Sequence, residues 1–150
     1  MNEQWIRQEN IVFNLNATSK EDVFRYASDQ LKSNGYLRGG DQFYEALIDR
    51  ESQVSTGIGN GFAIPHGLSD TVIQSTAYVM VLSQAIDWGS IDDQPVKYVI
   101  LMAIEDDKEA KNNLHLKNLA RLAEKMVDKN FLAEIKSAQN EIDLYHALID

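Results

Sequence analysis

The chain of 150 residues contains no cysteine. Without thiols it can form no disulfide, no thiolate nucleophile and no cysteine-based metal site. No apolar run approaches the roughly 18 to 20 residues that a membrane helix needs. The N-terminal segment MNEQWIRQEN also lacks the basic start and apolar core of a secretory signal. We therefore expect a cytoplasmic protein that does not insert into a membrane.

Basic residues are the minority among the charged ones. Lys and Arg together number 14 against 23 Asp and Glu, which gives a net charge of −9. Nucleic-acid binding needs clustered basic residues, and here they are scattered, so we expect no nucleic-acid partner. The 44% hydrophobic and 25% charged residues are ordinary for a globular protein, and the length suits one domain, residues 1–150.

The apolar pattern predicts alternating strands and helices. Strands are expected at 11–15, 76–82 and 96–104, and the latter two are apolar on both faces, as central strands of a covered sheet are. One helix is expected through Val23, Ala27 and Leu31, capped by Thr18 or Ser19 and ended by Gly35. Further helices are expected at about 41–50, 113–128, 131–138 and 141–149. The fold class is α/β, a single domain with a mixed β-sheet flanked by helices on both faces.

Residues 50–67, RESQVSTGIGNGFAIPHG, concentrate the chemistry of the chain. Glycines stand at every second position from 57 to 61, which suits a loop that bends sharply or approaches another group closely. The segment lacks the third glycine of a dinucleotide fingerprint and the Gly-Lys-Ser/Thr of a nucleoside-triphosphate loop. It leads into a short strand, 62–64, which Pro65 stops, so that His66 is presented just past the strand end.

The other residues of the sequence limit the kinds of active site to which His66 could belong. The three histidines are far apart in sequence, which argues against a metal site, and no Gly-x-Ser-x-Gly elbow marks a hydrolase. Imidazole is itself a nucleophile, and phosphoryl transfer asks the protein mainly for positioning and for donors to the phosphoryl oxygens. Arg50, Ser55, Thr56 and the loop amides are candidate donors. From the residues alone, a structural role for His66 stays open.

The segment that ends in His66 and Gly67 resembles the signature of a known family. Residues 55–67, STGIGNGFAIPHG, resemble the active-site signature of the fructose- and mannitol-type (type 2) enzyme IIA domains of the bacterial phosphoenolpyruvate-dependent sugar phosphotransferase system. The resemblance includes Arg50-Glu51, the Ile86-Asp87-Trp88 turn, the segment VKYVILMAI and HLKNLARLAEKM at 115–126. It extends from roughly residue 10 to 148.

The resemblance implies a phosphotransferase. His66 would accept a phosphoryl group from the phosphohistidine of the carrier HPr and donate it to a IIB domain, and through IIB the protein would work with a membrane IIC component. By motif position, His115 is a second functional histidine and Arg50 a functional arginine. Ser55, Thr56, Gly59 and Gly61 are the candidate phosphate-binding residues. No cofactor and no metal are expected.

Each of these residues also has a simpler interpretation. His115 shares the inward stripe of its helix with Leu119, Leu122 and Met126, so it is also compatible with a buried histidine bonded to a backbone carbonyl. It lies in the first helical turn, where the dipole favours a neutral ring. Arg50 is also compatible with a surface arginine that favours the dipole of its helix, and hydroxyls before a glycine turn are commonly turn residues.

The remaining candidate residues have weaker signals. Phe62 and Leu68 are expected at an apolar rim around His66 or in the core. His146 is expected in a structural position, and Asp92 and Asp93 are expected in a turn.

Three functions remain open on the sequence. The first is sugar transport through a IIB domain. The second is a regulatory role, as in nitrogen-related IIA proteins, and the third is a degenerate relative that binds without transfer. The sequence names neither a sugar nor an oligomeric state.

Overall fold

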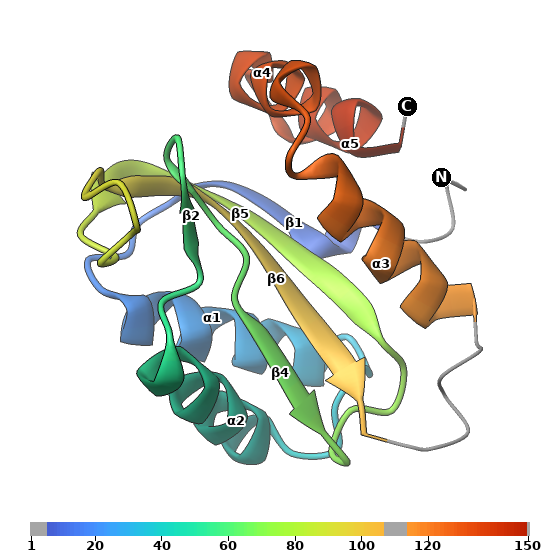
Figure 1. Cartoon of the computed structure of the whole chain (residues 1–150). Helices are drawn as coiled ribbons and strands as arrows, with labels where there is room; N and C mark the ends of the chain where they lie inside the picture. Colours follow the sequence, from blue (N-terminus) through green and yellow to red (C-terminus); the bar gives the residue numbers. More distant parts are fainter. Residues whose placement is uncertain (1–5, 107–113, 150) are drawn as a thin grey trace.

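A computed structural model of the chain describes residues 6–106 and 114–149. Its centre is a mixed β-sheet with helices on both faces (Figure 1). Across the sheet the strands run in the order β1 (Ile11–Leu15), β5 (Thr76–Ile86), β6 (Val96–Glu105), β3 (Phe62–Ala63) and β2 (Gly57–Gly59). A further strand, β4 (His66–Ser69), also pairs with β6. The helices are η2 (Gln8–Asn10, 3-10), α1 (Lys20–Ser33), α2 (Gly40–Gln53), α3 (Leu114–Lys125), α4 (Lys129–Ser137) and α5 (Glu141–Ile149).

The sheet is mixed because its central pair is antiparallel while its flanking strands are parallel. β5 and β6 are antiparallel, β1 is parallel to β5, and both β3 and β4 are parallel to β6. β2 closes the sheet as an antiparallel hairpin with β3. The expected strands 11–15, 76–82 and 96–104 are confirmed, and β5 extends four residues beyond its expected end.

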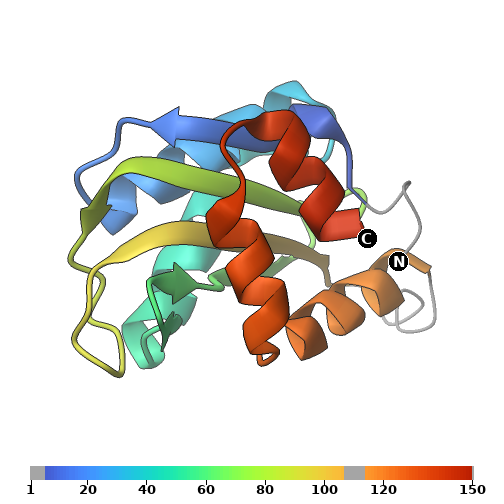
Figure 2. The same ribbon diagram turned by 90° about the horizontal axis from the view of Figure 1, so that it is seen from above.

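Alternate residues of the central strands supply two cores. From β5, one core receives Tyr78, Met80 and Leu82, and the other receives Ala77, Val79 and Val81. The first core lies under α1 and α2 and the second under α3, α4 and α5. Figure 2 shows α3 to α5 in front of the sheet and α1 and α2 behind it. A sheet buried on both faces explains the uninterrupted apolar runs, and the predicted fold class is confirmed.

Local sequence signals set the bounds of the first helices. Ser19, the second of the two expected caps, accepts a hydrogen bond from Asp22 N at 3.1 Å, and Gly35 takes a φ of +87° just after α1. α2 reaches Gln53, three residues beyond the expected end. Among the helices of the described residues, none is long and apolar enough to cross a membrane.

Candidate active site

His66 opens a strand of its own. β3 ends at Ala63, and after Pro65 the chain pairs with β6 again, with His66 in register with Met102. Met102 N donates to the Pro65 carbonyl at 2.9 Å, which fixes this restart of the strand. The expectation that His66 lies just past a strand end is therefore incomplete, because His66 is also the first residue of β4. Since Met102 belongs to the core under α3 to α5, the side chain of His66 is on that face of the sheet.

Arg50 reaches His66 from the last turns of α2. Its Nε donates to His66 Nε2 at 3.1 Å, and its Nη1 donates to the Val54 carbonyl at 2.9 Å. Arg50 and His66 are both half-buried. The structure thus brings together two candidate residues that are sixteen positions apart in sequence, and the second hydrogen bond of the guanidinium keeps it beside the ring.

The close approach of α2 to β4 depends on Gly67. A Cβ at this position would lie 2.8 Å from Phe43 Cε1 and 3.4 Å from Leu47 Cδ2. Phe43 and Leu47 are fully buried on the face of α2 that packs against β4, and Arg50 follows on the same face one turn later. The lack of a side chain at Gly67 therefore sets how closely Arg50 approaches His66.

We expect Gly67→Ala to lower the free energy of unfolding by about 1 to 3 kcal/mol, because the new methyl group meets a ring that has no free space. Urea unfolding measures this change. Gly40→Ala is the matched control, since its Cβ would have only ordinary contacts, 3.5 Å or more, at the start of the same helix. There alanine should be neutral or stabilising. An equal loss in both variants would contradict the close-packing argument.

The hydrogen bonds of the ring decide its tautomer. A guanidinium has no acceptor, so Nε2 of His66 must accept the bond from Arg50. Nδ1 lies 3.3 Å from the Ile64 carbonyl, which can only accept. The neutral ring therefore carries its proton on Nδ1 and a lone pair on Nε2. The nucleophilic nitrogen is the one that faces Arg50.

A buried carboxylate fixes the segment between α2 and the strands. The side chain of Glu51 is 7% exposed and accepts from Thr56 N at 2.9 Å, from Thr56 Oγ1 at 2.5 Å and from Lys20 Nζ at 3.0 Å. Trp88 Nε1 donates to Thr56 Oγ1 at 3.3 Å. The Thr56 carbonyl in turn accepts from Ile64 N at 3.0 Å. Glu51 thereby holds the chain that carries the Ile64 carbonyl, the partner of His66.

The candidate phosphate-binding residues do not all lie near His66. Thr56 pairs with the strand two residues before the histidine, and Ser55 Oγ accepts from Gly57 N at 3.2 Å in the same segment. Gly59 pairs with Phe62 at the other end of the β2–β3 hairpin, and Gly61 follows in its turn. Phe62 and His66 pair with β6 residues four positions apart, which is about 13 Å along a strand. The structure does not bring Gly59 and Gly61 to His66.

His115 belongs to the first turn of α3, but its side chain is outside the described part of the chain. Its role therefore stays a prediction. The rest of the expected stripe is as predicted, because Leu119, Leu122 and Met126 are all buried in the second core.

The structure places the other candidate residues in different environments. Phe62 is fully buried and belongs to the core, whereas Leu68 is 57% exposed on the same face of β4 as His66. His146 is exposed on α5, next to the Tyr145 ring. Asp92 accepts from the backbone N–H groups of Asn60 and Gln94, and these bonds lower the pKa of its carboxyl group, as in a turn residue. Within residues 6–106 and 114–149, no three His, Cys, Asp or Glu side chains are grouped as metal ligands.

Comparison with known proteins decides the family. The family model described as "Phosphoenolpyruvate-dependent sugar phosphotransferase system, EIIA 2" matches residues 4–150. The chain belongs to this EIIA family. The resemblance read from the segment around His66 is thereby confirmed, and with it the assignment of the chain to a phosphotransferase system.

Relatives of this EIIA domain include transport and regulatory proteins. It is 32% identical to a fructose-specific EIIABC component of Bacillus subtilis over 136 residues, 91% of this chain and 21% of the relative. It is 33% identical to a nitrogen regulatory protein of Escherichia coli over 108 residues, 71% of this chain and 64% of the relative. The chain thus spans about a fifth of the length of the first of these relatives and just under two thirds of the second. The crystal structure of the nitrogen regulatory protein IIA-Ntr from Neisseria meningitidis superposes with a TM-score of 0.83 at 25% identity, covering 97% of both chains.

Several residues of the EIIA site have roles that the sequence did not assign. Glu51 and Trp88 belong to the quoted motifs, but the motifs do not show that both side chains meet at Thr56. Nothing in the sequence indicated that Lys20 or Val54 has a role in the site. A lysine that follows a helix cap and a valine that follows a helix end are both common in proteins. Val54 is 67% exposed and its carbonyl accepts from Arg50, so an exposed apolar residue lies beside the arginine.

Proposed function

We propose that this EIIA domain is a phosphocarrier that takes a phosphoryl group from phospho-HPr on Nε2 of His66 and passes it to a sugar-specific IIB domain. The observation that carries the proposal is the ring of His66. Its Nδ1–H faces the Ile64 carbonyl, and its Nε2 lone pair lies beside an arginine on an accessible edge of the sheet.

The transfer follows from these contacts. The Nε2 lone pair attacks phosphorus as the bond from phosphorus to the donor nitrogen breaks, and the proton stays on Nδ1. The positive charge that the ring acquires is offset by the Ile64 carbonyl and by the phosphoryl oxygens. Once Nε2 carries phosphorus it can no longer accept a hydrogen bond, so the guanidinium of Arg50 is free to donate to the phosphoryl oxygens. In the second half-reaction a nucleophile of IIB attacks the same phosphorus and Nε2 leaves.

His115 is proposed to assist from α3. His66 points to the face of the sheet that α3 covers, and His115 lies in the first turn of that helix, so the placement of the two residues supports this role. Val54 and Leu68 are proposed to form the apolar rim on which HPr and IIB dock in turn, because both are exposed and flank the reacting pair. Through IIB, the protein would work with a membrane IIC component.

A regulatory role is the second candidate. The likeness to nitrogen regulatory proteins from Escherichia coli and Neisseria meningitidis favours it, since the same site would then serve as a switch whose phosphorylation state sets protein binding. The two roles share the chemistry of His66. They differ in whether a IIB domain removes the phosphoryl group.

The decisive experiment is phosphorylation by enzyme I, HPr and phosphoenolpyruvate, followed by intact-mass analysis. We expect one acid-labile phosphate on the wild type, none on His66→Ala and slower loading of His115→Ala. His146→Ala is the control, because this histidine is exposed outside the site. Loss of the phosphate to sugar-type IIB proteins supports transport, and its retention supports regulation. A folded wild type that takes no phosphate from HPr would contradict both.

A further inference from the structure

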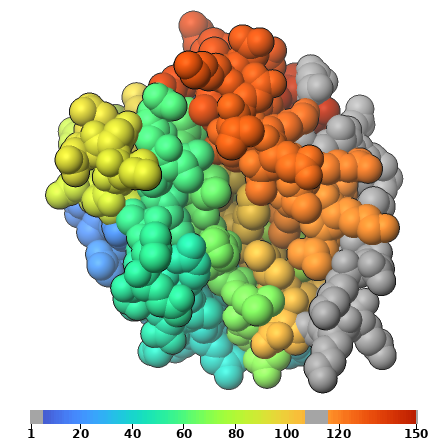
Figure 3. Space-filling view, in the orientation of Figure 1, coloured from blue at the N-terminus to red at the C-terminus, as the bar shows by residue number. Residues whose placement is uncertain are grey.

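A pocket lies between the β2–β3 hairpin and α4, away from His66. It has a volume of about 270 Å³ and is lined by Asn60, Lys129, Leu132, Ala133 and Lys136. Asn60 stands at the hairpin turn, and the other four residues share one face of α4. Figure 3 shows the hairpin (green) and α4 (orange-red) meeting at the upper surface of the molecule.

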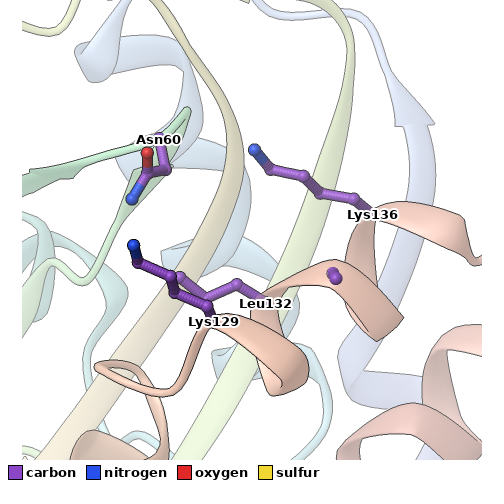
Figure 4. A pocket seen from close by; sticks show the side chains of 5 residues that line it. Asn60, Lys129, Leu132 and Lys136 are labelled. Atoms are coloured by element: carbon purple, nitrogen blue, oxygen red, sulfur yellow. The ribbon is translucent and has the colours of Figure 1, made fainter.

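The polar groups of this pocket are mostly cationic. Figure 4 shows the ammonium groups of Lys129 and Lys136 and the amide of Asn60 directed into the same space. Neither lysine forms an ion pair with a carboxylate of the described residues. Lys136 Nζ is instead 5.6 Å from the centre of the Phe62 ring. In a chain of net charge −9, two unpaired lysines that converge on one hollow form a local positive site.

Two carboxylates near the pocket accept hydrogen bonds from backbone N–H groups. Asp92 is occupied by the backbone N–H groups of Asn60 and Gln94, at 3.0 and 3.1 Å. Asp128 caps α4 by accepting from Asn130 N at 2.8 Å. Both carboxylates keep their charge, but neither forms an ion pair with Lys129 or Lys136, so the two ammonium groups keep their donors for a ligand.

The shape and charge of the pocket select a ligand class. Two ammonium groups match the charge of a dianion, and the Asn60 amide adds a neutral donor. Leu132 and Ala133 provide an apolar floor beside these groups. The volume lies just below the range of roughly 300 to 1,000 Å³ for small-molecule pockets, which suits a ligand of a few carbon atoms. We propose that this pocket binds a small phosphate monoester, with the phosphate between Lys129, Lys136 and Asn60 and the carbon body on Leu132 and Ala133.

The proposal does not depend on phosphoryl transfer at His66. It can therefore be tested on the unphosphorylated protein without HPr. Glycerol 3-phosphate is the probe, titrated into ¹⁵N-labelled protein, and the amides of Asn60, Gly61 and residues 129–136 report binding. Inorganic phosphate, glycerate and glycerol are titrated in parallel, so that the phosphate, the charge and the carbon body are tested separately.

Variants make the test specific. We expect Lys129→Gln/Lys136→Gln to weaken binding of glycerol 3-phosphate at least tenfold. Lys32→Gln/Lys117→Gln, which removes the same charge from exposed positions outside the pocket, should retain the affinity within about twofold. Asn60→Gly removes the amide while keeping the left-handed backbone, φ +59°, and should weaken binding severalfold. The single variant Lys129→Gln leaves the contact of Lys136 with Phe62 intact. It should weaken binding of glycerol 3-phosphate, while the amide signals outside the pocket stay unchanged and show that the protein is folded.

Three outcomes would overturn the proposal. The first is equal affinity in the wild type and in Lys129→Gln/Lys136→Gln. The second is equal loss in the pocket and control double variants, because the effect would then be one of net charge. The third is binding of glycerate or inorganic phosphate as tight as that of glycerol 3-phosphate, which would contradict the match to a phosphate ester.

Discussion

Replacing Arg50 by glutamine is expected to slow phosphoryl transfer onto His66 about 100- to 1,000-fold, the usual cost of removing one preorganised donor from a transition state. The guanidinium lies 3.1 Å from Nε2 in the resting protein, so it is beside the phosphorus when transfer begins. Glutamine is too short to keep the contacts with both His66 and Val54, and it carries no charge. The single-turnover rate of loading from phospho-HPr measures the effect.

Two further variants test whether the effect comes from the guanidinium of Arg50. Arg50→Lys keeps the charge but not the planar fork, so it should recover only part of the rate. Arg7→Gln removes an arginine whose side chain is 70% exposed and should leave the rate unchanged. If Arg50→Gln loads as fast as Arg7→Gln, the guanidinium is a structural contact of α2, and its assignment to the transfer is wrong.

Replacing Glu51 by glutamine is expected to lower the free energy of unfolding by about 2 to 4 kcal/mol, because it leaves buried groups without their charged partner. The amide has one acceptor oxygen, whereas the carboxylate serves Thr56 N, Thr56 Oγ1 and Lys20. The NH₂ group of glutamine would then face a donor. Chemical denaturation followed by circular dichroism measures the loss.

Glu45→Gln is the matched control for Glu51, since it makes the same change at an exposed position of the same helix and should cost less than about 0.5 kcal/mol. The double variant Lys20→Met/Glu51→Gln should lose less than the sum of its single variants, because the lysine is no longer left beside an uncharged amide. Equal stability of Glu51→Gln and Glu45→Gln would show that the buried carboxylate contributes nothing to the fold.

The sheet was predictable where burial on both faces leaves a continuous apolar run. The runs at 76–82 and 96–104 indicate central strands for this reason, and Val23, Ala27 and Leu31 indicate a helix through their spacing. β4 gave no such signal, because His66 to Ser69 has a mixed sequence and is a strand only through its pairing with β6. A strand that depends on a partner more than thirty residues away cannot be recognised from its own residues.

The motif predicts which residues belong to the site, but it does not predict how they are arranged in space. Arg50 and His66 come from the motif, and their contact follows once α2 packs on Gly67. The motif also joins Gly59 and Gly61 to His66 in sequence, but the hairpin carries them away along the strand direction. The partners of Glu51 are Lys20 and Thr56, and Thr56 is in turn bonded by Trp88. These residues come from separate segments of the sequence, and only the folded chain brings them together.

The bond between Nδ1 of His66 and the carbonyl two residues earlier has a consequence for the two half-reactions. Because the chain itself orients the imidazole, the loss of rotational freedom is incurred once, during folding, and does not recur with each encounter. In the proposed function, the same preset ring would meet HPr and IIB, so neither partner would have to use binding energy to align it. Loading and unloading would then pass through one shared geometry, as suits the proposed carrier, which must exchange its phosphoryl group readily in both directions.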